Sequence, residues 1–441
     1  MEQRRKNLTQ LFIPICLETL LYMLSGMVDT LMLSSVNDQA VGAVGTANTY
    51  IGIFIIMFSV ISSGMVAVMT QNIGAGRPGV AYQARQLGLA FNAVLGVIMS
   101  LFLSLGAGTI LSGVGVADAL MQPAKTYLQI VGGFCILNAL IPICSSYLRA
   151  FGFSKEPLYA SIIGNVINFC LNAFFLFVLH KGVAGVATAT VISRIINLMI
   201  VVLLGAVLVK AKQHPERESN RAVMGQIIRI GLPSACETAI YNVSMTLVIR
   251  FLNQMDAQGL NVTARSYTMQ ITNFSYCVGA ALAQANAIMT GWHIGAKEYD
   301  ACDRGTKKAA VIGVIVAVIL ETVFTLCSGW IMQLFSKDPQ MVSLVGKLLA
   351  IDIVLEIGRV TNLVYGQALK TSGDAVFPVV MGACFMILCS VGGTYLFGIR
   401  LGLLAVGAYI GMTGDECVRA VGMYLRWKSG KWKEKGLVKS R

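Results

Sequence analysis

Charged residues are scarce in this sequence. Only 12% of the 441 residues are charged, whereas 56% are hydrophobic. A soluble domain carries roughly 25% charge, so this chain has too few polar groups to cover a surface that faces water on all sides. The composition predicts an integral membrane protein.

Several motifs of enzymes and ATP-driven pumps are absent. The three histidines form no His-Glu-x-x-His pattern, and no Gly-x-x-x-x-Gly-Lys-Ser/Thr segment occurs, which argues against a zinc hydrolase and an ATPase. None of the eleven cysteines forms a Cys-x-x-Cys pair, so we expect free thiols rather than disulfides or a zinc site. The sequence therefore predicts neither an enzyme nor a protein with a cofactor.

Long apolar stretches run along the whole chain. They are continuous rather than alternating every second residue, which favours membrane-spanning helices over a β-barrel. Twelve spans are expected, near 10–34, 46–71, 87–111, 124–148, 158–179, 186–209, 227–252, 267–291, 307–332, 343–367, 378–398 and 402–425. The predicted fold is an all-α integral membrane protein of twelve transmembrane helices.

The two halves of the chain repeat each other about 220 residues apart, so they are predicted to form two homologous six-helix lobes. The predicted organisation is an amino-terminal lobe at 1–209, a basic linker at 210–226, a carboxy-terminal lobe at 227–425 and a basic tail at 426–441. The repeated positions include Pro14 and Pro233, Glu18 and Glu237, Arg149 and Lys370. Two such halves are typical of transporters whose site lies between them.

The net charge of +13 reflects membrane topology rather than nucleic-acid binding. If each span crosses once, most basic residues fall on one side of the membrane, together with both termini and the linker. The positive-inside rule assigns that side to the cytoplasm, where basic loops also face anionic lipid.

Ionisable residues inside the spans are costly and generally functional. Glu18 and Asp29 share the first span, on one face and roughly 16 Å apart along the helix, and both could face one cavity. Asp29 is the candidate for binding a proton or sodium ion and attracting a cationic substrate. Glu18 and Glu237 occupy equivalent places after a proline and are candidates for gating or ion binding.

The tenth span carries Asp352, Glu356 and Arg359 on a single stripe. Such a stripe either neutralises itself as an internal salt bridge or handles ions or cargo. Glu321 is interpreted as lying near a span boundary, and no functional role is assigned to it. In the fifth and sixth spans, Asn168, Asn172 and nearby threonines offer sodium ligands or hydrogen bonds between helices.

Several segments together resemble the multidrug and toxic compound extrusion (MATE) transporters of bacteria. Each segment is a weak signal alone, but their order and spacing within twelve spans make the resemblance specific. They are Gly26-Met-Val-Asp-Thr30, Ala40-Val-Gly-Ala-Val-Gly45, Gln71-Asn-Ile-Gly-Ala-Gly76, Leu148-Arg-Ala-Phe-Gly152 and Gly164-Asn-Val-Ile-Asn168.

The resemblance implies a bacterial inner-membrane antiporter that exchanges cargo for sodium or protons by alternating access. It implies an ion site at Asp29, Asn168 and Thr190, with no metal beyond sodium. Two departures stand out. Asn172 replaces an aspartate that is frequent in the family, and Tyr241 stands where one branch has a coupling glutamate. We therefore expect weaker sodium binding or plain proton coupling.

The acidic face of the first span favours small cationic or amphiphilic cargo. The alternative is a flippase for lipid-linked saccharides, which would need several basic residues along its cavity, whereas the spans offer mainly Arg194 and Arg359. Twelve spans suffice to build a cavity in a monomer.

Overall fold

The computed structural model describes residues 6–35, 38–113, 116–210, 216–256, 258–333 and 335–438. The predicted linker residues 211–215 and tail residues 439–441 lie outside this part. Contacts divide the chain into an amino-terminal unit, Met1–Leu232, and a carboxy-terminal unit, Pro233–Arg441. The division falls inside a helix, slightly after the predicted linker.

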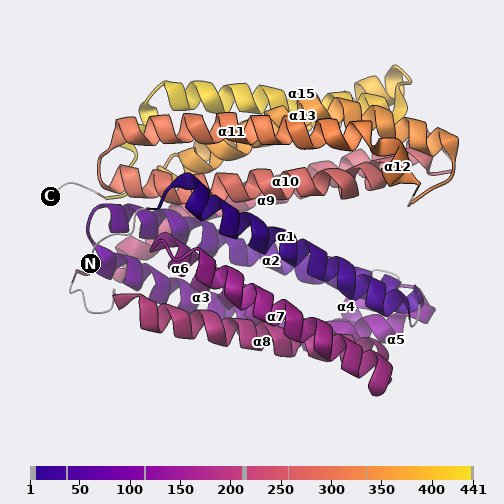
Figure 1. The fold of residues 1–441 in the computed structure, drawn as a ribbon, viewed down its shortest axis with the longest axis horizontal. Coiled ribbons are helices and arrows are strands. Elements are labelled where there is room, and N and C mark those ends of the chain that lie inside the picture. The colour runs from indigo at the N-terminus through magenta and orange to yellow at the C-terminus, as the bar shows by residue number, and fades with distance from the viewer. Residues whose placement is uncertain are drawn as a thin grey trace. The chain divides into compact units, whose positions relative to one another are not determined.

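The amino-terminal unit is built of helices, several of which lie side by side (Figure 1). The α-helices are α1 (Leu8–Ser34), α2 (Asp38–Gly74), α3 (Pro78–Leu105), α4 (Ala107–Gly113), α5 (Asp118–Tyr127), α6 (Ile136–Ala150), α7 (Lys155–Ala173) and α8 (Gly182–Leu208). Two π-helical segments follow α-helices directly: η1 (Leu128–Gly132) follows α5, and η2 (Phe174–Val178) follows α7.

The carboxy-terminal unit follows the same plan, and α9 (Asn220–Met255) contains the division between the units. Helix α13 packs against α10, α11 and α15. After α9, the carboxy-terminal unit contains α10 (Leu260–Gly295), α11 (Tyr299–Leu326), α12 (Ser328–Met332), α13 (Pro339–Thr371), α14 (Val376–Phe385), η4 (Met386–Val391), η5 (Thr394–Arg400), α15 (Leu404–Lys428) and the 3₁₀ turn η6 (Lys431–Glu434).

The all-α membrane fold is confirmed, but the count of twelve spans is not reached by length and apolar character alone. Seven helical segments of the described chain meet that test, or eight if the pair Asp118–Gly132 and Ile136–Ala150, bent by 43°, is one span. The other predicted spans fall on α9, α10, α13 and α15. Polar and charged residues lower the hydropathy of these four helices, and several of them line the polar site described below.

The start of α9 packs closely on α2 within the amino-terminal unit. A Cβ atom on Gly231 would lie 1.7 Å from the Val60 carbonyl oxygen, and one on Gly64 would lie 2.0 Å from the Ile227 carbonyl oxygen. Only glycine permits this approach of two backbones, which is a common device of helix packing in membranes.

The described end of the predicted linker is anchored to α3. Arg217 donates a hydrogen bond to the Gly79 carbonyl at 2.6 Å, and Glu218 forms an ion pair with Arg77 at 2.6 Å. Gln83 exchanges hydrogen bonds with the Glu218 backbone. Helix α9 then begins at Asn220.

None of the eleven cysteines is joined in a disulfide bond. Five are buried, and four are exposed on the helix surfaces: Cys170, Cys236, Cys327 and Cys384.

The described part of the predicted basic tail is folded onto the carboxy-terminal unit. The chain turns at Gly430 (φ 71°), and the Trp432 ring stacks on Trp427 with centroids 4.2 Å apart. Asp374, in the loop between α13 and α14, accepts hydrogen bonds from Arg426 and Lys435, each at 2.7 Å. One buried carboxylate therefore ties the tail to this loop.

These bonds also determine the charge state of Asp374. Burial alone would raise its pKa, but the hydrogen bonds from Arg426 and Lys435 outweigh burial and lower the pKa of Asp374 below its ordinary value of 3.8. Because the folded pKa is lower than the unfolded one, the stabilisation is complete above pH 3.8. It is lost as the pH falls through the folded pKa.

We predict that Asp374→Asn lowers stability at pH 7 by about 1–3 kcal/mol, because two basic side chains lose their shared partner. Thermal unfolding of the detergent-solubilised protein measures this change. Asp300→Asn, an exposed carboxylate in the first turn of α11, is the control and should leave the midpoint nearly unchanged. Equal midpoints for both variants would contradict the anchoring role.

Candidate functional site

The repeated glutamates form the same ion pair in both units. Arg149 of α6 donates to Glu18 of α1 at 2.5 Å. In the other unit, Lys370 of α13 lies 2.5 Å from Glu237 of α9. Both members of the pair recur in sequence and again in space. These glutamates thus have basic partners, which favours a structural or gating role over ion binding.

The proline before Glu18 has a local consequence. Pro14 has no N–H to donate to the carbonyl of Gln10, one helical turn earlier. That carbonyl instead accepts a hydrogen bond from the buried Ser154 hydroxyl at 3.0 Å. The break in the helix is therefore satisfied by the segment that leads into α7, close to the Glu18 ion pair.

In the amino-terminal unit, three of the four predicted ion-site residues lie together. The Asn172 amide nitrogen donates to Asp29 Oδ1 at 2.6 Å and lies 3.3 Å from Asn168 Oδ1. Both asparagines are buried. Thr190 is not joined to them by a hydrogen bond in the described chain, because its hydroxyl donates to the Val186 carbonyl at 2.9 Å.

The surroundings of Asp29 are mostly neutral. No ion pair to Asp29 occurs among the described residues, although Arg194 of α8 lies within electrostatic range. The buried Asn172 Oδ1 also has no hydrogen-bond partner there. One carboxylate and two amide oxygens are hard ligands of the kind that sodium prefers, and the carboxylate alone can take a proton.

The carboxy-terminal unit contains a cavity of about 400 Å³. Of the predicted residues, Glu237, Tyr241, Asp352 and Arg359 line this cavity, whereas Glu356 does not. Its other basic residues are Arg265, Lys370 and Arg419, and its other acidic residues are Asp415 and Glu416. The basic lining is therefore larger than predicted, since mainly Arg194 and Arg359 were expected to supply positive charge within the spans.

One ion pair connects α13 and α15 at this cavity, and further ion pairs lie within each of the two helices. Arg419 donates to Asp415 at 2.8 Å and lies 2.9 Å from Glu416. Arg359 pairs with Glu356 on its own helix and lies 3.7 Å from Glu416. The stripe on α13 is therefore partly self-neutralised, and Asp352 is the member that forms no ion pair within the described chain.

Arg265 differs from the other basic residues of the cavity. Its side chain is buried, and its Nε has no hydrogen-bond partner in the described part of the chain. Its Nη2 lies 3.7 Å from the Met245 sulfur, which is a weak acceptor. No ion pair to Arg265 occurs among the described residues. An unpaired guanidinium attracts an anionic group.

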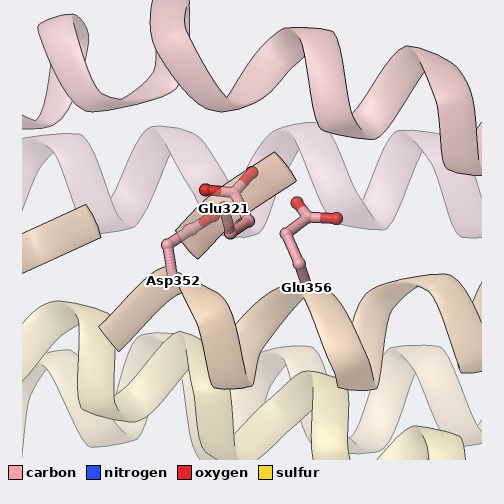
Figure 2. A group of neighbouring side chains, drawn as sticks. All are labelled: Glu321, Asp352 and Glu356. Atoms are coloured by element: carbon pink, nitrogen blue, oxygen red, sulfur yellow. The ribbon is translucent and has the colours of Figure 1, made fainter. Parts of the chain in front are cut away.

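Three carboxylates meet between α11 and α13. One oxygen from each of Glu321, Asp352 and Glu356 lies within 4.8 Å of the others, as Figure 2 illustrates. All three side chains are buried, and Glu321 is 0% exposed. The packing of α11 on α13 encloses Glu321, which lies in the last turns of α11 (Tyr299–Leu326).

Sequence reasoning missed the charges of α10 and α15. The eighth span was expected to begin at 267, but α10 begins at Leu260 and includes Arg265. Asp415, Glu416 and Arg419 fell inside the predicted last span. Their spacing of three and four residues was the available signal, since it places the arginine beside both carboxylates on a helix.

Comparisons with known proteins agree with this architecture. The MatE family model matches residues 14–174 and 233–396. The "Uncharacterized transporter YisQ" of Bacillus subtilis is 34% identical over 96% of this chain and 94% of its own length. The "Probable multidrug resistance protein NorM" of Thermotoga maritima is 23% identical over 98% of this chain and 94% of its own length.

A solved structure of "MATE in the straight conformation" superposes with a TM-score of 0.86 at 19% identity, covering 97% of this chain and 96% of that one. At this identity the likeness concerns the fold alone.

The duplicated ion pair gives a direct prediction. Reversing one charge, as in Glu237→Lys or Lys370→Glu, places like charges together in a mostly buried site and should cost about 1–3 kcal/mol. The double variant restores opposite charges and should recover most of the thermal midpoint. A double variant no more stable than the singles would show that the pair does not stabilise this unit.

Proposed function

The chain belongs to the MatE family of membrane transporters, and from this premise we propose that it exports small organic compounds in exchange for sodium ions or protons. Relatives named as multidrug resistance proteins support this class of cargo. The protein is a transporter and not an enzyme. We further propose that it works as a monomer in the bacterial inner membrane, with both termini in the cytoplasm.

The observation that carries the proposal is the environment of Asp29. Glu18 and Glu237 are held by basic partners at 2.5 Å, whereas Asp29 is bonded to the neutral amide of Asn172. A carboxylate without a fixed basic partner gains most from an external cation, because its charge is otherwise poorly compensated in an apolar helix. Asp29 is therefore the residue expected to load and release the coupling ion.

The coupling follows from competition for this carboxylate. A proton or sodium ion at Asp29 weakens its hydrogen bond from Asn172, and with it the link between α1 and α7. Sodium would also use the Asn168 oxygen, and Thr190 could join after its hydroxyl leaves the Val186 carbonyl. A cationic or amphiphilic cargo is favoured when Asp29 is charged and disfavoured when the ion is bound.

A flippase for lipid-linked saccharides is the second candidate. The basic residues that line the carboxy-terminal cavity, and Arg265 without an acidic partner among the described residues, favour an anionic head group. The acidic residues of the same cavity and the uncompensated Asp29 favour the exporter.

Efflux from reconstituted vesicles tests the proposal. We expect a fluorescent organic cation to be driven by an imposed sodium or proton gradient, and Asp29→Asn to reduce the rate at least ten-fold. Asp118→Asn, an exposed carboxylate in the first turn of α5, is the matched control and should retain the wild-type rate. Absence of gradient-driven movement in a folded wild type would contradict the exporter and favour lipid-linked cargo.

Asn172→Asp tests the ion preference of this site. It places a second carboxylate where the amide now lies 2.6 Å from Asp29. Two adjacent carboxylates retain a cation more strongly. The affinity for sodium should therefore rise by about ten-fold, which corresponds to about 1.4 kcal/mol. Direct sodium titration of the purified protein measures this change, and an unaltered affinity would place the sodium elsewhere.

A further inference from the structure

We propose that Arg265 of α10 binds an anionic group, a carboxylate or a phosphate, on the compounds that this transporter moves. The proposal rests on the transport function argued above and names the chemical class of the cargo: a small amphiphile whose polar end carries a negative charge. A cationic group on the same molecule remains compatible with the preference for cations proposed above.

The charge balance of the cavity sets Arg265 apart. Among the described residues, it is the one basic side chain of the lining without a carboxylate partner. The other three have such partners: Lys370 pairs with Glu237, Arg419 with Asp415 and Glu416, and Arg359 with Glu356 and Glu416. A guanidinium stays protonated at every pH that a protein experiences, so it cannot relieve the cost of burial by losing its charge. An anion that enters the cavity supplies the missing partner.

The guanidinium of Arg265 also presents a suitable edge to an oxyanion. Its Nε has no hydrogen-bond partner in the described part of the chain, and its Nη2 lies 3.7 Å from the Met245 sulfur, a weak acceptor. These two nitrogens direct their N–H groups in parallel and can donate to two oxygens of one carboxylate or phosphate. A bound oxyanion therefore gains two charge-assisted hydrogen bonds and displaces only a weak sulfur contact.

The position of Arg265 on α10 directs it into the cavity rather than toward lipid. Met269, Thr272 and Tyr276 follow it at helical spacing on the same face, and all of them line the cavity. Arg265 is 5% exposed, whereas Arg250, at a similar distance from the turn between α9 and α10, is exposed. An arginine that only anchored a helix end at the membrane surface would extend outward, so Arg265 has a different role.

The remaining lining fits the body of an amphiphile. Five aromatic and methionine side chains line the cavity: Tyr241, Met245, Met269, Tyr276 and Met412. Such side chains form adaptable apolar walls, and the cavity volume of about 400 Å³ falls within the range of about 300–1,000 Å³ for small-molecule sites. Asp352 on α13 forms no ion pair in the described chain, so a negative group is favoured at the α10 wall and disfavoured beside α13.

Equilibrium binding of two matched fluorescent compounds tests the proposal. Nε-dansyl-L-lysine has a carboxylate and an amine at one end and an apolar fluorophore at the other, and its carboxamide lacks only the negative charge. Each is titrated against the protein in phosphatidylcholine nanodiscs, with empty nanodiscs subtracted. We expect the wild type to bind the carboxylate compound at least about ten-fold more tightly, because hydrogen bonds to a charged group are gained.

Arg265→Gln should remove this difference, because it weakens binding of the carboxylate compound by about ten-fold and leaves the carboxamide within about two-fold. Arg265→Lys keeps the charge without the paired donors and should retain part of the difference. Arg250→Gln is the matched control and should bind both compounds as the wild type does. Thermal unfolding verifies that each variant is folded, and the comparison of the two compounds on the wild type requires no variant.

Equal binding of the two compounds by the wild type would overturn the proposal, as would a preference for the carboxylate that survives in folded Arg265→Gln. Because the experiment uses no ion gradient, such a result would leave the exporter itself to be judged by efflux.

Phosphatidylglycerol distinguishes the two sources of an anionic group, a membrane lipid and a water-soluble compound. Nε-dansyl-L-lysine has no net charge, so an anionic membrane surface changes its local concentration little. If lipid head groups occupy Arg265, nanodiscs that contain phosphatidylglycerol weaken binding of the carboxylate compound to the wild type. An unchanged affinity assigns the site to water-soluble cargo, and anion binding by Arg265 is supported in both cases.

Discussion

The compensation of buried charge is the constraint on which this structure depends. Helices that face lipid cannot leave an ionised group without a partner, because no water is available to solvate it. Glu18 and Glu237 meet this requirement with Arg149 and Lys370. Asp29 meets it only partly, through an amide, and the cluster around Glu321 leaves it unmet within the described chain. The degree of compensation separates groups that hold helices together from groups suited to exchanging cations.

The two halves share their framework but differ in their chemistry. Each half has the same proline, glutamate and basic residue, and the resulting pair joins its first helix to the end of its fourth span. The amino-terminal half then presents one carboxylate among amides. The carboxy-terminal half presents a charged cavity backed by three carboxylates. A duplicated scaffold has thus acquired two unlike polar sites, one in each unit.

Much of this could be predicted because it depends on local sequence. Apolar runs indicate helices, and the four-residue spacing of Asn168 and Asn172 places both amides on one helix face. Spacing does not reveal which helices meet. Glu321 therefore could not be linked to α13, nor Trp432 to Trp427, because those contacts depend on packing between distant segments. Thr190 shows a second limit, because its place on a helix does not reveal that its hydroxyl donates to the Val186 carbonyl of the same helix.

The central claim is that the cargo and the coupling cation compete for binding to the protein, so that one is released when the other binds. Its most direct test is the release of cations when cargo binds, measured with purified protein in weakly buffered solution by a pH electrode and a sodium-selective dye. The account predicts that adding a saturating organic cation releases protons or sodium in stoichiometric amounts. Cargo that binds without releasing either ion would contradict it.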